Sequence, residues 1–84
     1  MSAPERRPLL VQQAADHSWR LGIRACKSIV EALLRTRYDL LQDGFPAAHA
    51  LCEDIDKDAA KWAATEQRMR RDWLRERSAD EESR

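Results

Sequence analysis

The sequence predicts an all-α protein, an antiparallel two-helix hairpin that we expect to dimerise into a four-helix bundle. Thirteen alanines and nine leucines stand against three isoleucines and two valines. This composition favours helix over strand, because alanine loses no side-chain entropy in a helix while β-branched side chains are stiff. Only two glycines and three prolines interrupt the 84 residues. Apolar residues also recur at steps of three and four along two long segments, which is the helical period.

The first of these segments predicts a helix over residues 8–42. The polar residues 1–7 precede it and are expected to form a flexible N-terminus. Pro8 is tolerated in the first turn of a helix, where its missing N–H needs no partner. Gly22 lies inside the span and costs about 1 kcal/mol there. The apolar period stays in phase across it, which favours one helix; a break at Gly22, giving three helices, is the alternative.

The clearest helix boundary in the sequence is the turn expected at residues 43–46. Gly44 can adopt the left-handed conformation that ends a helix, and Pro46 suits the first position of the next. A second helix is therefore expected over 46–77, followed by a disordered charged tail at 78–84. Helices joined by so short a turn must pack antiparallel.

The apolar residues define one seam on each helix, and residues 8–77 should pack along these seams as one hairpin. We expect the first seam to begin at Val11 and the second to contain one polar residue, Glu66. Glu66 should form an ion pair with the first helix or splay the hairpin slightly; the alternative is a contact with another protein. The residues expected in the core or the dimer contact are Trp19, Ile23, Cys26, Val30, Leu33, Ile55, Ala59 and Trp62.

The hairpin carries more apolar surface than one partner helix can cover. Leu21 and Leu74 lie outside the seams, and so do several alanines of both helices. A chain this short also buries only about 60% of its unfolded surface, which leaves a single core marginal. Both observations predict a homodimer.

The turn position also predicts which residues face each other across the hairpin, because their numbers should sum to about 89. Opposite charges meet in that register. The expected neighbours are Arg35 with Asp54, Arg37 with Glu53 and Asp56, and Glu31 with Lys57 and Lys61.

No catalytic residue, metal site or cofactor is expected. The register places Cys26 and Cys52 roughly 16 Å apart at 1.5 Å per residue, too far for a disulfide, and both suit buried positions on the seams. His17 and His49 point away from the seams, and no nucleophile arrangement or glycine-rich phosphate loop is present. The sequence therefore indicates a protein that is not an enzyme.

The charges balance, 15 basic against 15 acidic, but they are not evenly spread. Five arginines lie within residues 67–77, at the end of the hairpin away from the turn, and part of this pattern complements the helix dipole. Arginine beside tryptophan and methionine is also typical of interface hot spots. The residues expected to bind a partner are Arg68, Met69, Arg70, Arg71, Trp73, Leu74 and Arg75 with Arg20 and Arg24.

We therefore expect a small interaction protein, an adaptor, chaperone or inhibitor, that binds a larger bacterial protein. An accessory subunit of an enzyme would look the same in sequence. The alternative is an RNA- or DNA-binding regulator, because the predicted hairpin dimer resembles in outline the Rop-type RNA-binding hairpin, although no motif is shared. The neutral net charge makes nucleic acid the weaker expectation. No apolar run approaches the length of a membrane span, and a cytoplasmic location is expected.

Overall fold

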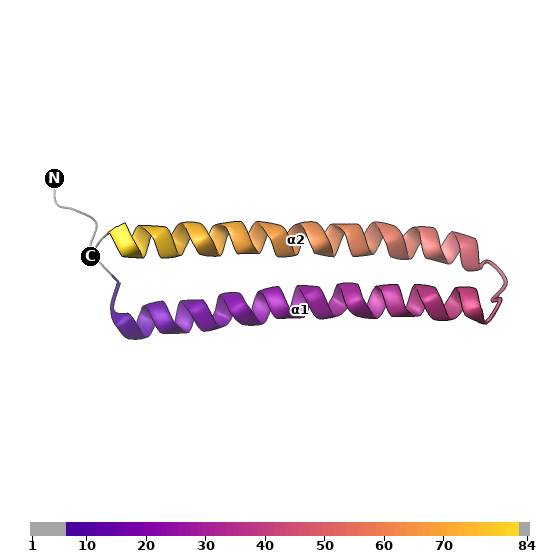
Figure 1. The fold of residues 1–84 in the computed structure, drawn as a ribbon, viewed down its shortest axis with the longest axis horizontal. Helices are drawn as coiled ribbons and strands as arrows, with labels where there is room; N and C mark the ends of the chain where they lie inside the picture. Colours follow the sequence, from indigo (N-terminus) through magenta and orange to yellow (C-terminus); the bar gives the residue numbers. More distant parts are fainter. Residues whose placement is uncertain (1–6, 83–84) are drawn as a thin grey trace.

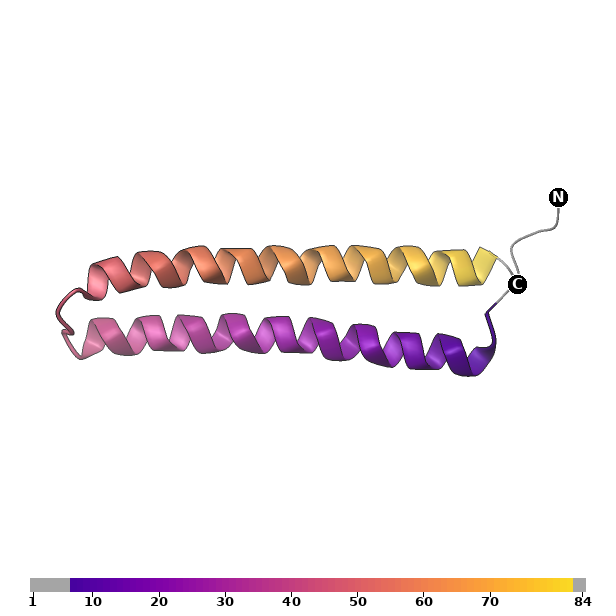
Figure 2. The same ribbon diagram turned by 180° about the vertical axis from the view of Figure 1, so that it is seen from behind.

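The computed structural model describes residues 7–82 as two long helices joined by a tight turn (Figure 1). Helix α1 spans Leu9–Gln42 and α2 spans Ala48–Glu82. They lie side by side and antiparallel along their whole length in both views (Figure 2). The Cα trace extends over 64 × 22 × 11 Å, so the hairpin is a single layer of two helices. The predicted all-helical hairpin is confirmed.

The helix limits differ from the expected ones mainly at the C-terminal end. Helix α1 is continuous through Gly22, so the three-helix alternative is wrong. Helix α2 continues to Glu82, five residues beyond Arg77, where a disordered tail was expected. The extension has a physical reason, because Asp80 is held by the guanidinium of Arg7 across the hairpin. Of the ends expected to be flexible, residues 1–6 and 83–84 lie outside the described residues.

The turn closes with paired backbone hydrogen bonds. The N–H of Phe45 donates to the carbonyl of Leu40 at 3.3 Å, and the N–H of Gly44 donates to that of Leu41 at 3.4 Å. These two bonds form a Schellman motif, which requires a left-handed residue between them, and Gly44 has φ 63°. Ala47 also has a positive φ, 66°, so α2 begins at Ala48 instead of Pro46.

Both helices contribute a seam with alternating steps of four and three residues. Three members of the expected core, Ile23, Cys26 and Ala59, are buried, and Trp62 is 36% exposed. The others are half-buried: Trp19, Val30, Leu33 and Ile55. The expected start at Val11 is wrong by one residue, because Val11 is 48% exposed and Gln12 is buried with its amide donating to the carbonyl of Arg7 at 2.6 Å.

Gly22 has a packing role in α1. A Cβ at this position would overlap the terminal methyl of Met69, so the glycine gives the methionine its space. The Met69 sulfur lies 3.7 Å from Sγ of Cys26. Farther along, Sγ of Cys52 lies 3.9 Å from the carbonyl oxygen of Arg37. Both cysteines are buried free thiols.

Candidate functional site: a cationic groove

Trp73 organises the half of the hairpin away from the turn. Its indole Nε1 donates a hydrogen bond to Oδ1 of Asp16 at 2.7 Å, which joins α2 to α1. The guanidinium carbons of Arg20 and Arg77 lie 5.8 and 5.2 Å from the centre of the Trp73 ring. Cations at this distance are attracted to the electron-rich face of an indole. The tryptophan therefore fixes one carboxylate and gathers two arginines from different helices.

Beside this ring the two helices form an open groove of about 290 Å³. It is lined by Arg20, Ile23, Arg24, Lys27, Arg70 and Trp73, and we call it the cationic groove. Ile23 is buried and Trp73 is half-buried, while the arginines and the lysine are exposed. An apolar patch rimmed by cations can receive an anionic group together with an apolar side chain.

Glu66 forms an ion pair within its own helix. Its carboxylate lies 3.5 Å from Nε of Arg70, one turn later in α2, and its side chain is 19% exposed. The partner from α1 that the sequence suggested is therefore replaced by Arg70. This ion pair also positions Arg70 at the rim of the cationic groove.

The structure divides the predicted binding residues into two groups. Arg20, Arg24, Arg70 and Trp73 come together in the cationic groove. The remaining five are not among its lining residues: Arg68, Met69, Arg71, Leu74 and Arg75. Met69 packs in the seam, and Leu74 is 57% exposed. We call Arg68, Arg71 and Arg75 the outer arginines; Arg75 is 81% exposed in its side chain and lies 3.9 Å from Asp72.

Sequence reasoning missed two groove residues as binding residues, Lys27 and Ile23. Lys27 follows Arg20 and Arg24 at helical spacing, and that stripe was the available signal. Ile23 was assigned to the core alone, yet it also forms part of the groove wall.

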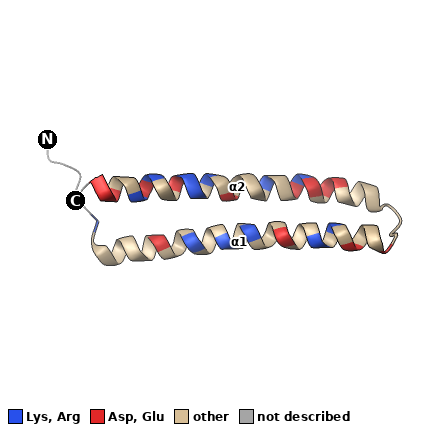
Figure 3. Ribbon diagram, viewed as in Figure 1, with Lys and Arg blue, Asp and Glu red and all other residues tan. Residues whose placement is uncertain are grey.

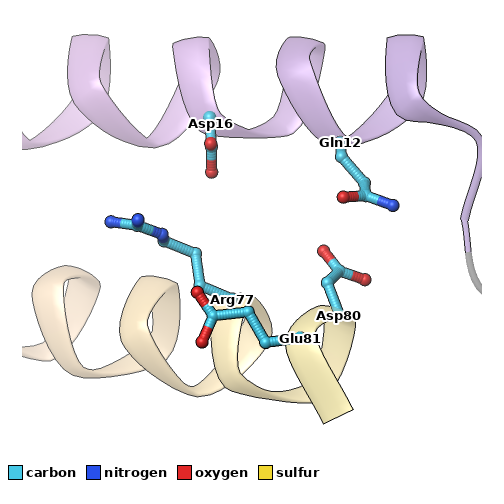
Figure 4. A pocket seen from close by; sticks show the side chains of 5 residues that line it. All are labelled: Gln12, Asp16, Arg77, Asp80 and Glu81. Carbon is cyan, nitrogen blue, oxygen red and sulfur yellow. The ribbon is translucent and has the colours of Figure 1, made fainter. Parts of the chain in front are cut away.

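A second, smaller pocket of about 100 Å³ lies nearer the chain ends (Figure 4). Side chains from α1 and α2 point toward one another there, and we call it the acidic pocket because three of its five residues are carboxylates. The five lining residues are Gln12, Asp16, Arg77, Asp80 and Glu81. Arg77 and Asp16 both contact Trp73, so this pocket is continuous with the network around the tryptophan.

Further polar contacts join the two ends of the described chain, near Arg7 and Asp80. The indole N–H of Trp19 donates to Oε2 of Glu76, and Arg7 forms ion pairs with Glu76 and Asp80. The hydrogen bond to Asp80 raises the pKa of the Arg7 guanidinium, and the negative charges of both carboxylates act in the same direction. Arg7 therefore stays charged at every ordinary pH. Residue types and spacing did not predict this network, because its members are polar and follow no apolar period.

The described residues offer neither a metal cluster nor a membrane span. Within 7–82, no three His, Cys, Asp or Glu side chains gather where they could hold a metal ion. Neither α1 nor α2, in the part of the chain described, has a stretch long and apolar enough to cross a bilayer.

Fold and site together define an antiparallel helical hairpin with a cationic groove on one side. No family model matches the chain, and no curated protein or solved structure matches it.

Proposed function

We propose that the chain is a non-enzymatic interaction protein that works as a homodimeric four-helix bundle and binds a larger protein. The observation that carries this is the exposure of its apolar side chains. Five hydrophobic residues are buried among those described, and none of the large ones reaches full burial. Eleven large hydrophobic residues are exposed in the same part of the chain.

A bundle would resolve this imbalance. Burying apolar surface contributes about 25 cal/mol per Å², and a lone hairpin leaves much of that contribution unused. Two hairpins packed face to face give each helix two neighbours instead of one. The exposed alanines, such as Ala60 and Ala64, would let the helices approach closely.

Sedimentation equilibrium at micromolar concentration tests the dimer. We expect a species of twice the 9.7 kDa chain mass. A stable species of 9.7 kDa would contradict dimerisation.

The outer arginines are the proposed contact with the larger protein. All three are exposed and belong to the basic stretch 67–77 (Figure 3). Capture from a bacterial lysate, followed by mass spectrometry, should recover a partner with the wild type and lose it when Arg68, Arg71 and Arg75 are all changed to alanine. A matched control removes three cations elsewhere, at Arg35, Lys57 and Lys61, and should keep the partner. Equal capture by both variants would exclude this surface.

Nucleic acid is the second candidate, and the four cations of the cationic groove favour it. A protein that binds phosphates loses affinity steeply as salt rises, because counterions are released on binding. The measurement is fluorescence anisotropy with RNA and DNA over a salt series. A steep slope would support this candidate, and absence of binding at low salt would eliminate it.

A further inference from the structure

We propose that the side of the hairpin carrying the cationic groove is a self-complementary dimer face, on which the acidic half of α2 from a second copy occupies the groove. This inference rests on the dimer proposed above and names the surface and the contact that form it.

One stripe of α2 carries the charge pattern on which the argument depends. Its members follow one another at alternating steps of three and four: Glu53, Asp56, Ala60, Ala63, Gln67, Arg70, Leu74 and Arg77. Two contacts place the basic end of the stripe on the groove side, because Arg70 lines the cationic groove and Arg77 lies over the Trp73 ring with Arg20. Helical spacing continues the stripe to Asp56, which lies 3.0 Å from Nε of Arg37 on α1.

The charges of this stripe are opposite at its two ends. Glu53 and Asp56 lie toward the turn, Arg70 and Arg77 lie toward the chain ends, and Ala60 and Ala63 lie between them. Figure 3 shows acidic residues gathered on α2 near the turn and basic residues farther along the helix. A two-fold axis perpendicular to the helices reverses the direction of the partner's α2, so it brings the acidic end of one copy onto the basic end of the other. The same contact is then made twice, as an isologous interface requires. Alanines at the centre allow the backbones to approach there.

Helix α1 adds apolar residues to the same face. Starting from Lys27 in the groove, the same helical spacing leads through Glu31 to Leu34, Tyr38 and Leu41. These three are 48%, 62% and 41% exposed. These three residues lie toward the turn. In the reversed partner they therefore lie against the half of the first copy that contains the cationic groove, where Leu74 is 57% exposed. The interface thereby gains an apolar component beside its charges.

A second copy fits this face better than a polyanion. Along the hairpin, the acidic pocket lies between the cationic groove and the chain ends, and Asp56 and Glu53 lie between the groove and the turn. A nucleic acid running along the hairpin would meet these carboxylates, whereas a second copy presents both signs in reversed order. The outer arginines are not part of the groove lining and would stay available to the larger protein.

A reciprocal charge swap tests the face. One variant carries R24E and K27E in the groove, and the other carries E53K and D56K. Each alone juxtaposes like charges at both copies of the contact, and the dimer dissociation constant should rise more than about 100-fold. Mixed together, the two variants restore opposite charges at both contacts, and heterodimers should form with nearly wild-type affinity. Sedimentation of each variant and of the mixture is the measurement.

The control variant, R68E with R75E, makes the same change of charge on the outer arginines and should dimerise normally. Far-ultraviolet circular dichroism checks that every variant remains helical. If both swaps leave the dimer intact, the proposed face is wrong while dimerisation stands; if the wild type is monomeric, dimerisation itself fails. If R24E with K27E abolishes capture of the larger protein and leaves the dimer intact, the groove belongs to that protein and this inference is overturned.

Discussion

The two halves of the hairpin share one helical geometry and differ in what holds them together. In the turn half, residues 23–66, the seam is mostly apolar, and its buried residues include Ile23, Cys26 and Ala59. In the open half, which comprises 7–22 and 67–82, Met69 packs against Gly22 and the other interhelical contacts are polar. These are Trp19 to Glu76, Trp73 to Asp16, and Arg7 to Glu76 and Asp80.

This difference gives the two halves different roles: one in the stability of the hairpin, the other in the register of α1 against α2. Apolar contacts are non-directional, so a seam of alanine, isoleucine and leucine tolerates a shift of one helix along the other. A hydrogen bond from an indole to one carboxylate oxygen is directional and is lost in a shifted register. We infer that the turn half supplies most of the free energy of folding, and that the open half fixes the alignment of α1 on α2.

The largest expected effect lies in the turn half. Changing Ile23 to alanine removes a buried side chain, 7% exposed, and should lower the free energy of unfolding by about 2–4 kcal/mol. Urea denaturation gives the value. Leu21 is the matched control because it is 49% exposed, and its change to alanine should cost less than about 1 kcal/mol. Equal losses would contradict the placement of the seam.

The open half should respond to loss of a single hydrogen-bond donor. Trp73→Phe keeps an aromatic ring and removes the N–H that Asp16 accepts, so we expect a loss of about 1–2 kcal/mol in thermal or urea unfolding. Trp19→Phe should behave alike through Glu76. Trp62→Phe, at the partly exposed tryptophan of the turn half, is the control and should be near neutral. A larger effect at position 62 would reverse the assignment of roles.

Gly22 and Met69 should be energetically coupled, because a Cβ at position 22 needs the space of the methionine methyl group. Gly22→Ala alone should stabilise by less than the roughly 1 kcal/mol that helix propensity offers. With Met69→Ala present the full gain should appear, so a double-mutant cycle should give a coupling of at least about 0.5 kcal/mol. Additive effects would show that Met69 moves aside without cost.

The smallest effect is expected at the ion pair of Arg37 and Asp56. Both side chains are substantially exposed, 40% and 52%, so Arg37→Ala should change stability by no more than about 1 kcal/mol. The change should shrink further in high salt, because solvent-exposed charges are screened. A salt-independent loss would indicate that the pair is buried in the assembled protein.

The sequence was more informative for one half than for the other. Gly44 in its turn, the apolar period of the turn half and the closeness of Arg37 to Asp56 could all be predicted from residue types and spacing. In the open half the seam runs through Gln12 and Asp16, which read as solvent-facing positions in a hydropathy pattern. The indole N–H of Trp73 explains the placement of Asp16, and the hydrogen bond to the Arg7 carbonyl explains that of Gln12. Hydropathy in a single helix carries no information about such partners.

The candidate site could likewise be predicted only one helix at a time. The spacing of Arg20 and Arg24 predicted a basic patch, and Arg70 with Trp73 predicted another on the second helix. That these four share one groove, while Arg68 and Arg75 do not line it, depends on the rotation of each helix about its axis. This rotation is set by the packing of Met69 against Gly22 and by the Trp73 to Asp16 bond.

The thinness of the hairpin, 11 Å along its shortest axis, has a thermodynamic consequence. A single layer buries only a narrow seam, and in the proposed dimer the second copy would supply the second layer. Folding and association then form one equilibrium, in which a bound copy stabilises the folded chain by mass action. The melting temperature of this protein should therefore rise with its concentration, and its abundance in a cell would itself determine how much of it is folded.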